Sequence, residues 1–366
     1  MPLAPLILGP NQPRQFYRGG ARIAAFRGIT PASEYLPEDW VGSTTELLGR
    51  PGAGLTVLDD GSTLRSAIAA DPAGYLGPAH AGRFGADPAL LVKLLDTGER
   101  LLVHCHPSRP FAAAHLHSCH GKTEAWIVTQ ITPDGADDSA GHVYAGFRED
   151  TDPAVVRAWV DAQDTAALLG SLNRVPVAPG DTCLIPAGVP HAVGAGVTVV
   201  EVQEPTDFSI LLEWEGYAVS GPEAGPRGLG YRLALEALDY SGWDRDRLAG
   251  LLGGRAEPDG QAEPDGRAGA DGRAGADGRA GAGPVRLLPP QADEFFRVER
   301  ILPRALPLSL APQVAVLVVL DGRGRLVSEA GAVPVGRGAT LLVPYGAGAV
   351  RLEGDLHVLR CMPPAP

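Results

Sequence analysis

One turn pattern occurs twice in this chain, and this repeat constrains the fold more than any other sequence feature. The first copy, G-x5-P-x-G-x2-H, covers residues 180–191 and ends in His191; the second keeps the spacing over residues 338–349 but ends in Ala349. Glycine and proline at fixed offsets specify turns between strands. The repeat therefore predicts two copies of one β-unit, of which only the first offers a histidine ligand at this position.

The rest of the chain also has the pattern of a mainly β protein. Its 366 residues suffice for two domains, and a hydrophobic content of 45% is typical of a globular protein. Short apolar runs between glycine- and proline-rich segments predict strands. These runs lie at residues 90–95, 125–129 and 197–202. Apolar residues at helical spacing predict packing helices over residues 63–70, 153–172 and 231–238.

A six-residue repeat marks the boundary between the two predicted domains. It reads AEPDGQ, AEPDGR, AGADGR, AGADGR and has almost no side chain larger than alanine to bury, so we predict a disordered linker over 253–284. A calcium-binding β-roll would need a nine-residue period with a regular large apolar residue, which is missing. The linker separates a domain at 1–250 from a strand-rich module at 285–366.

Net charge and composition limit the binding partners and the cellular location that the sequence predicts. The net charge of -12 argues against a nucleic-acid surface, and no stretch approaches the roughly 20 apolar residues of a membrane span. The sequence therefore predicts a cytoplasmic protein that contacts neither membrane nor nucleic acid, as a monomer or small homo-oligomer. Its four cysteines are too scattered for a disulfide framework, and we expect reduced thiols.

Histidines are concentrated in one region of the chain, where they predict a metal site. Seven of the nine lie between His104 and His191. Alternate residues of a strand share a face, so His104 and His106 can point together into a barrel, as can Lys122 and Glu124. His191 can complete the set from its turn. Two or three imidazoles and a carboxylate suit one Zn²⁺ or a similar divalent ion.

A second group of metal-type ligands follows the first along the chain. His115, His117, Cys119 and His120 lie in one short stretch with no partner pair elsewhere. We therefore interpret this segment as an exposed loop or helix. Cys183 lies within an apolar run and is predicted to be a core residue.

These motifs resemble the type I phosphomannose isomerases, zinc-dependent members of the cupin superfamily. The matching segments are LLVKLLD at 90–96, HCHP at 104–107, GKTEAW at 121–126 and PAGVPHA at 186–192. The resemblance covers most of 1–250 and, more faintly, the C-terminal module. It implies two cupin-type (jelly-roll) β-barrel units with accessory helices, the second without metal ligands.

The resemblance also implies roles for individual residues. His106, Glu124 and His191 would be zinc ligands, with His104 at a position where the family usually has glutamine. Lys93 and Lys122 match lysines of the sugar pocket, and Glu201 matches its carboxylate. Glu201 alternates with Val199 and Gln203 in a valine-rich strand, so an inward position and a solvent-facing one both remain open.

Three departures from the family pattern concern the substrate. The arginine that members use for substrate binding and catalysis is replaced by Leu211, the usual Trp-Gly-Gly is Arg18-Gly19-Gly20, and the metal-segment glutamine is His104. A guanidinium can bind two phosphate oxygens at once, whereas leucine cannot. Arg18, Arg148 or the two pocket lysines are the candidates to compensate.

The sequence therefore predicts an isomerase that interconverts mannose 6-phosphate and fructose 6-phosphate through a metal-stabilised enediolate. Glu201 is the candidate proton carrier, Lys122 assists, and Lys93, Lys122 and Arg18 bind substrate. Two alternatives stay open. One is an isomerase or epimerase for another sugar, phosphorylated or not, and the other is a non-catalytic sugar-binding cupin.

Overall fold

The computed structural model of the chain describes residues 3–132, 139–253, 283–302 and 307–365. Most of the repeat for which a disordered linker is predicted falls on residues 254–282, outside the described residues. The chain on either side of it forms two short strands, β12 (Leu252–Gly253) and β13 (Val285–Arg286).

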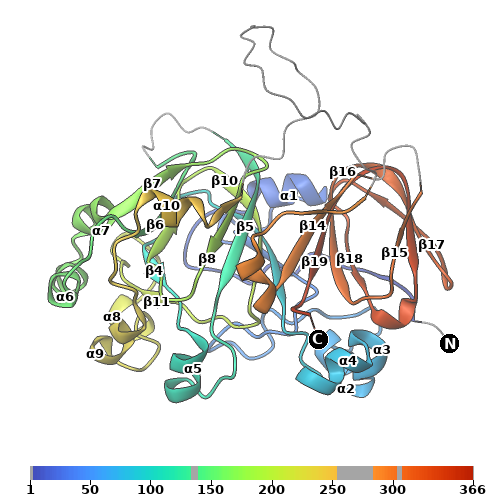
Figure 1. Cartoon of the computed structure of the whole chain (residues 1–366), viewed down its shortest axis with the longest axis horizontal. Coiled ribbons are helices and arrows are strands. Elements are labelled where there is room, and N and C mark those ends of the chain that lie inside the picture. Colours follow the sequence, from blue (N-terminus) through green and yellow to red (C-terminus); the bar gives the residue numbers. More distant parts are fainter. Residues whose placement is uncertain (1–2, 133–138, 254–282, 303–306, 366) are drawn as a thin grey trace, which may run out of the picture.

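Three antiparallel sheets form the body of the protein (Figure 1). The six-stranded sheet has the order β12-β8-β5-β10-β3-β2, and the five-stranded sheet has the order β11-β4-β9-β6-β7. Their strands are β2 (Glu38–Val41), β3 (Leu91–Asp96), β4 (His104–Cys105), β5 (Glu124–Ile131), β6 (His142–Phe147), β7 (Leu172–Pro176), β8 (Thr182–Ile185), β9 (His191–Val193), β10 (Val197–Gln203) and β11 (Ile210–Leu211). The predicted mainly β architecture is thus confirmed.

The eight-stranded sheet contains the strands of the C-terminal module and one strand from the N-terminus. Its main path is β1-β18-β16-β19-β14-β13, while β15 pairs with β19 and β17 pairs with β16. The members not yet given are β1 (Leu6–Ile7), β14 (Arg297–Ile301), β15 (Leu308–Leu310), β16 (Ala315–Ser328), β17 (Gly331–Gly336), β18 (Thr340–Val343) and β19 (Val350–Met362). The predicted boundary at 250 does not account for β1, which crosses over to the sheet of 285–366.

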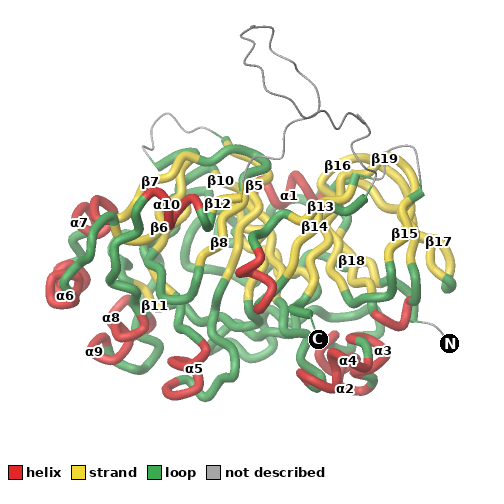
Figure 2. Tube along the Cα trace, in the orientation of Figure 1, coloured by secondary structure: helices red, strands yellow, loops and turns green. Residues whose placement is uncertain are grey.

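The helices are short and lie around the sheets (Figure 2). The α-helices are α1 (Ala21–Arg27), α2 (Leu64–Ala70), α3 (Pro72–Leu76), α4 (Pro78–Phe84), α5 (Arg109–His115), α6 (Pro153–Ala162), α7 (Thr165–Ser171), α8 (Gly221–Ala224), α9 (Tyr231–Ala234) and α10 (Arg245–Ala249). The 3-10 turns are η1 (Leu235–Ala237), η2 (Pro290–Glu294) and η3 (Tyr345–Ala347). Within the described residues, no helix has the length and apolarity to cross a membrane.

The single helix predicted over 153–172 is wrong, because the chain forms two helices there. Gln163 adopts a left-handed backbone with φ 52°, and Asp164 caps α7 by accepting a hydrogen bond from the Ala167 amide. The Gln163 side chain accepts from the Trp214 amide and donates to the Leu212 carbonyl. These tertiary hydrogen bonds stabilise the break between the helices, and the apolar spacing gave no sign of them.

Strand β10 separates two buried regions. It lies between β5 and β3, and successive side chains of a strand point to opposite faces. Val200 joins a core cluster that includes Val298 and Val318 of the C-terminal module, whereas Val199 joins the core of the six- and five-stranded sheets. The six-stranded sheet is therefore covered on both faces, and β10 contributes to both.

In each copy of the repeat, a buried four-residue strand leads into the proline of the turn. This strand is β8 in the first copy and β18 in the second. Gly338 needs to be glycine because a Cβ there would lie 2.0 Å from the Phe26 carbonyl oxygen of α1. The turns then differ: Gly188 has φ 89° in the first, whereas Gly346 lies in η3 and Gly348 has φ 70°. The two copies of the motif therefore share a buried strand but differ in the backbone of the turn.

A buried ion pair joins the N-terminal segment to the C-terminal sheet. Arg27, at the end of α1, lies 3.1 Å from Asp39 of β2, and both side chains are buried. The same guanidinium donates to the Gly338 carbonyl and the Thr340 hydroxyl at the start of β18. One side chain thus connects α1, β2 and β18.

We predict that Arg27→Met lowers the free energy of unfolding by roughly 3–5 kcal/mol, because Asp39 would remain as a buried charge without its partner. Denaturant unfolding measures the loss. The control is Arg65→Met, which breaks an exposed pair with Glu46 and should cost about 1 kcal/mol or less. Equal losses in the two variants would contradict a structural role for Arg27.

Candidate metal centre

All the predicted site residues except Arg18 line or adjoin one cavity of about 330 Å³. It lies between the six-stranded and five-stranded sheets, on the face of β10 that points away from the C-terminal module. Of the residues proposed from the sequence, the cavity is lined by Lys93, His104, Lys122, Glu124, Glu201 and Leu211. His106 and His191 are buried beside them.

The three predicted histidine ligands come together from two neighbouring strands. His104 of β4 lies directly opposite His191 of β9, and His106 follows two residues after His104. Their ring centroids are 4.1 to 4.9 Å apart. One nitrogen of each ring lies within 4.8 Å of one nitrogen of each of the others. The strand period that brings His104 and His106 to one face is the one the sequence predicts.

Backbone carbonyls fix the orientation of all three rings. Each Nδ1 lies 2.8 Å from a carbonyl oxygen, that of Leu102, Phe208 or Val189. Burial lowers the pKa of all three imidazoles, to about 3 for His106. They are therefore neutral, donate from Nδ1 and present the Nε2 lone pair to the centre, which is the arrangement of metal-binding histidines.

Glu124, the first residue of β5, supplies the carboxylate. Its Oε2 lies 3.0 Å from His106 Nε2, and its Oε1 lies 3.4 Å from His191 Nε2. Trp126 donates to Oε1 from its indole, and Lys122 lies 2.8 Å from Oε2. Burial opposes ionisation, but the charge of Lys122 beside the carboxylate holds the pKa of Glu124 well below its usual range.

The donor set fits a divalent ion. Three neutral imidazoles and one carboxylate are the nitrogen and oxygen ligands that Zn²⁺ takes in proteins. His191 Nε2 is buried and makes no hydrogen bond with the part of the chain that the structure describes. Such an unpaired buried atom needs an explanation, and a bound metal supplies one.

Two further carboxylates flank Lys93 in the same cavity. Lys93 Nζ lies 3.3 Å from Glu38 and 3.6 Å from Glu201, and cation–π contact with Trp40 covers it at 4.7 Å. Register explains the arrangement, because Glu201 of β10 pairs directly with Lys93 of β3, whose other neighbour is Trp40 of β2. Glu201 is therefore buried and inward-facing rather than solvent-exposed.

The pKa values of Glu201 and Glu38 are shifted in opposite directions. Burial and the charge of Glu124 raise the pKa of Glu201 to about 7, against the effect of the lysines. Burial acts on Glu38 as well, but Lys93 and hydrogen bonds from Tyr17 and Trp40 lower its pKa. Paired groups whose pKa values diverge in this way mark acid–base sites. Sequence reasoning missed Glu38, since β2 carries no motif.

The cavity also has guanidinium groups that the sequence did not single out. Arg227 lines it together with Arg14 and Arg50. Its side chain is held by the carbonyls of Asp207 and Ser209, and its backbone has the unusual φ of 53°. Leu211, at the position of the missing family arginine, lies directly opposite His104 and lines the same cavity.

The structure does not bring Arg18 into this group. Arg18 lines a separate surface depression, is largely exposed and lies 4.0 Å from Glu99. Arg148, the other suggested replacement, is exposed and also absent from the lining of the metal-centre cavity. The arginines that reach the cavity come from loops whose positions no sequence spacing predicts.

The segment with His115, His117, Cys119 and His120 is the end of a helix followed by a loop, as predicted, but His120 is largely buried. His115 ends α5, while His117 and Cys119 are exposed. The His120 side chain is only 12% exposed and lies 2.7 Å from Asp87. Burial opposes its protonation, but hydrogen bonds to Asp87 and Glu204 raise the pKa of His120 to about 10. Asp87, Cys119 and His120 lie close enough to hold an ion, which would have to displace the proton that His120 shares with Asp87.

Comparisons with known proteins agree with the motifs. Mannose-6-phosphate isomerase ManA of Bacillus subtilis (strain 168) is 26% identical over 266 residues, which are 72% of this chain and 72% of that protein. A mannose-6-phosphate isomerase of Streptococcus mutans serotype c is 34% identical over 118 residues, 32% of this chain and 34% of that protein. No family model matches the chain.

Solved structures extend the similarity to nearly the whole fold. Mannose 6-phosphate isomerase from Bacillus subtilis matches with a TM-score of 0.65 at 18% identity, covering 98% of this chain and 99% of that one. A lysine-to-alanine mutant of phosphomannose isomerase from Salmonella typhimurium matches with a TM-score of 0.68 at 16% identity, covering 99% and 100%. The resemblance to the phosphomannose isomerases is therefore confirmed.

We predict that protein equilibrated with zinc and then dialysed retains one ion per chain, measured by elemental analysis, and that His191→Ala retains almost none. Zinc should also raise the melting temperature of the unaltered protein, since it binds only the folded state. The control is Cys119→Ser, which removes a ligand from the second histidine group and should keep one ion. Loss of zinc from the control alone would place the metal in that group.

Proposed function

We propose that this protein is a zinc-dependent aldose–ketose isomerase that interconverts mannose 6-phosphate and fructose 6-phosphate. The observation that carries the proposal is one cavity in which a His₃–Glu ligand set lies beside a raised-pKa carboxylate and several cations. Relatives and structural neighbours are mannose-6-phosphate isomerases, which supports the predicted enzyme class.

We further propose a cupin architecture of two barrel units. A metal-binding unit would correspond to 1–250 and a unit without metal ligands to 285–366. The antiparallel sheets and the repeated strand and turn at β8 and β18 support this division. The pairing of β1 with β18 means that the N-terminal residues complete the second unit.

His104, His106, Glu124 and His191 would hold the metal. A divalent ion bound there would act as a Lewis acid that polarises the C1 and C2 oxygens of an open-chain sugar. Lys122 touches both His106 and Glu124, at 3.0 and 2.8 Å. Its ammonium is thus placed to stabilise negative charge that develops on the substrate oxygens.

Glu201 is the proposed proton carrier. As a carboxylate it would take the proton from C2 of the aldose, leaving an enediolate. As the acid it would return that proton to C1 while the O2 hydroxyl proton passes to O1, which gives the ketose. A pKa near neutrality suits both halves of this cycle. Glu38, held ionised by its hydrogen-bond donors, would instead fix the position of Lys93.

We propose that Arg227, together with Arg14 and Arg50, binds the phosphate and so replaces the family arginine lost at Leu211. All three arginines line the cavity, and Arg14 and Arg50 are in addition exposed to solvent. Guanidinium groups suit phosphate because their paired N–H groups match two oxygens. Arg18 has no part in this arrangement.

Turnover of mannose 6-phosphate by zinc-loaded protein, with and without a chelator, tests the function directly. We expect chelator-sensitive formation of fructose 6-phosphate. Equal rates on mannose and its phosphate would favour the isomerase or epimerase for another sugar, which Leu211 motivates. Binding of sugar phosphate without turnover would favour the non-catalytic sugar-binding alternative.

We expect Glu201→Gln to lower kcat by at least about 100-fold, since general acid–base catalysis contributes factors of that order. Zinc content and KM should change little, because Glu201 is not among the ligands. Steady-state kinetics and metal analysis measure both quantities. Glu38→Gln serves as the comparison: if it abolishes turnover while Glu201→Gln does not, the proton carrier is Glu38.

We expect Arg227→Met to raise KM for mannose 6-phosphate by about tenfold or more, because a lost charge-assisted hydrogen bond costs about 1.5–3 kcal/mol. Slow turnover of unphosphorylated mannose should be unaffected. The matched control is Arg148→Met, an exposed arginine outside the cavity. An unchanged KM for the phosphate in Arg227→Met would show that Arg227 does not bind it.

A further inference from the structure

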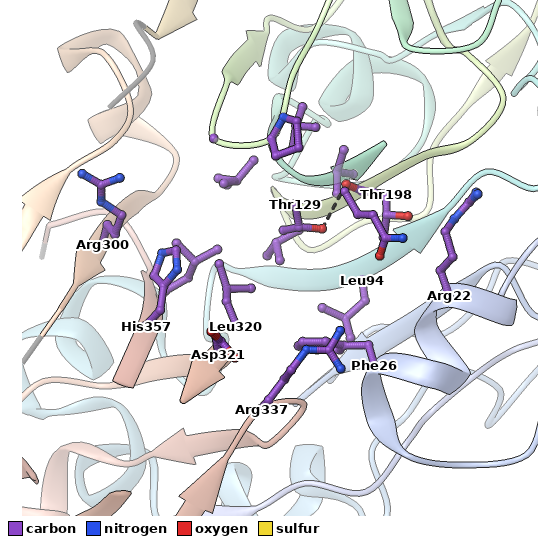
Figure 3. A pocket seen from close by; sticks show the side chains of 18 of the residues that line it. Arg22, Phe26, Leu94, Thr129, Thr198, Arg300, Leu320, Asp321, Arg337 and His357 are labelled. Atoms are coloured by element: carbon purple, nitrogen blue, oxygen red, sulfur yellow. Dashed lines mark hydrogen bonds between the residues drawn. The ribbon is translucent and has the colours of Figure 1, made fainter. Parts of the chain in front are cut away.

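A second cavity, of about 590 Å³, lies between the metal-binding sheets and the C-terminal sheet (Figure 3). It shares no lining residue with the metal-centre cavity. One wall consists of α1, the turn at 178–180 and the outward faces of β3, β5 and β10, and the other consists of β14, β16, β19 and the turn before β18. Its size is typical of small-molecule sites.

Three buried polar atoms in this cavity make no hydrogen bond with the described residues. They are Arg300 Nε, His357 Nε2 and Thr198 Oγ1. Figure 3 shows Arg300 and His357 on the C-terminal wall and Thr198 on the wall opposite. Buried polar groups in folded proteins are nearly always paired, so three unpaired atoms around one cavity indicate that a ligand supplies the partner.

The charged residues that line the cavity indicate which sign of charge the ligand carries. Arg300 has no ion-pair partner among the described residues, and Arg337 lies over the ring of Phe26 at 5.2 Å. Arg22 is already paired with Asp96. Asp321, which is exposed, is the one carboxylate among the residues that line the cavity. Arg300 and Arg337 thus make no ion pair within the described residues, and two such guanidiniums against one carboxylate favour an anion, although the chain carries a net charge of -12.

The remaining lining is mostly apolar, with Thr129 and Gln130 as its polar members. It includes Leu94, Ile127, Val200, Leu320 and Leu359, contributed by both walls. A small inorganic ion would leave most of this surface uncovered. A ligand that fills the cavity needs an apolar body as well as an anionic group.

We propose that the cavity between the two units is a binding site for a small amphipathic anion, a phosphate, sulfonate or carboxylate attached to an apolar group. Arg300 and Arg337 bind the anionic group, His357 Nε2 donates to it, and the leucine-rich walls cover the apolar part. The site is independent of the proposed isomerase activity. It lies on the opposite face of the sheet that carries Lys93 and Glu201, since Leu94 and Val200 are the chain neighbours of these two residues.

The test uses the full chain and 8-anilinonaphthalene-1-sulfonate, an aromatic sulfonate that fluoresces when it enters an apolar site. We expect saturable binding that inorganic phosphate weakens and mannose 6-phosphate does not. The double variant Arg300→Gln with Arg337→Gln should bind the probe at least about tenfold more weakly, a change of about 1.4 kcal/mol. The control Arg323→Gln removes an exposed arginine outside the cavity and should bind normally.

A second variant separates loss of the site from loss of the fold. Leu320→Trp should fill the cavity and weaken probe binding while the melting temperature of the protein changes little. Binding that mannose 6-phosphate displaces, with equal affinity in the arginine double variant, would place the probe in the metal-centre cavity and overturn the proposal. Absence of saturable binding to the unaltered protein would overturn it as well.

Discussion

The alternation of side chains along β10 is the constraint on which the rest of the structure depends. Glu201 points into the metal-centre cavity, while Val200 points into the core shared with the C-terminal module. Both faces are buried, so a shift of one residue in register would place a carboxylate in an apolar core and a valine beside Lys93. The pairing of Glu201 with Lys93 on one side and Trp126 on the other fixes that register.

Sequence reasoning identified the candidate metal ligands that the structure brings together because their signals are local. His104 and His106 share a face through the strand period, and His191 follows a turn whose glycine and proline are fixed by sterics. None of these inferences requires knowledge of distant pairing. The structure adds a contact that no local pattern indicates: the carbonyl of Phe208, 102 residues further along the chain, orients His106.

The part of the cavity away from the histidines was predicted less well, for a physical reason. Glu38 and Arg227 reach it from segments without periodic or motif character, and only tertiary pairing brings them there. Arg18 was a candidate because it replaces the tryptophan of the family's Trp-Gly-Gly and could compensate for the lost arginine, yet its side chain points to solvent beside Glu99. Similarly, β1 is a two-residue strand, too short for any pattern to assign it to the sheet of β18.

The charge of the metal-centre cavity differs in sign from that of the chain. Five cationic and four anionic side chains line it, in a protein whose net charge is -12. A divalent ion would raise the formal charge of the cavity from about +1 to about +3. In the proposed reaction this charge would offset a phosphate dianion and one further negative charge developing at the reacting carbons. This balance accounts for an acidic protein that keeps Lys93 and Lys122 buried, since each lysine is stabilised by a neighbouring carboxylate. For Lys93, burial alone would lower the pKa of the ammonium, and the neighbouring carboxylates of Glu38 and Glu201 more than offset that effect.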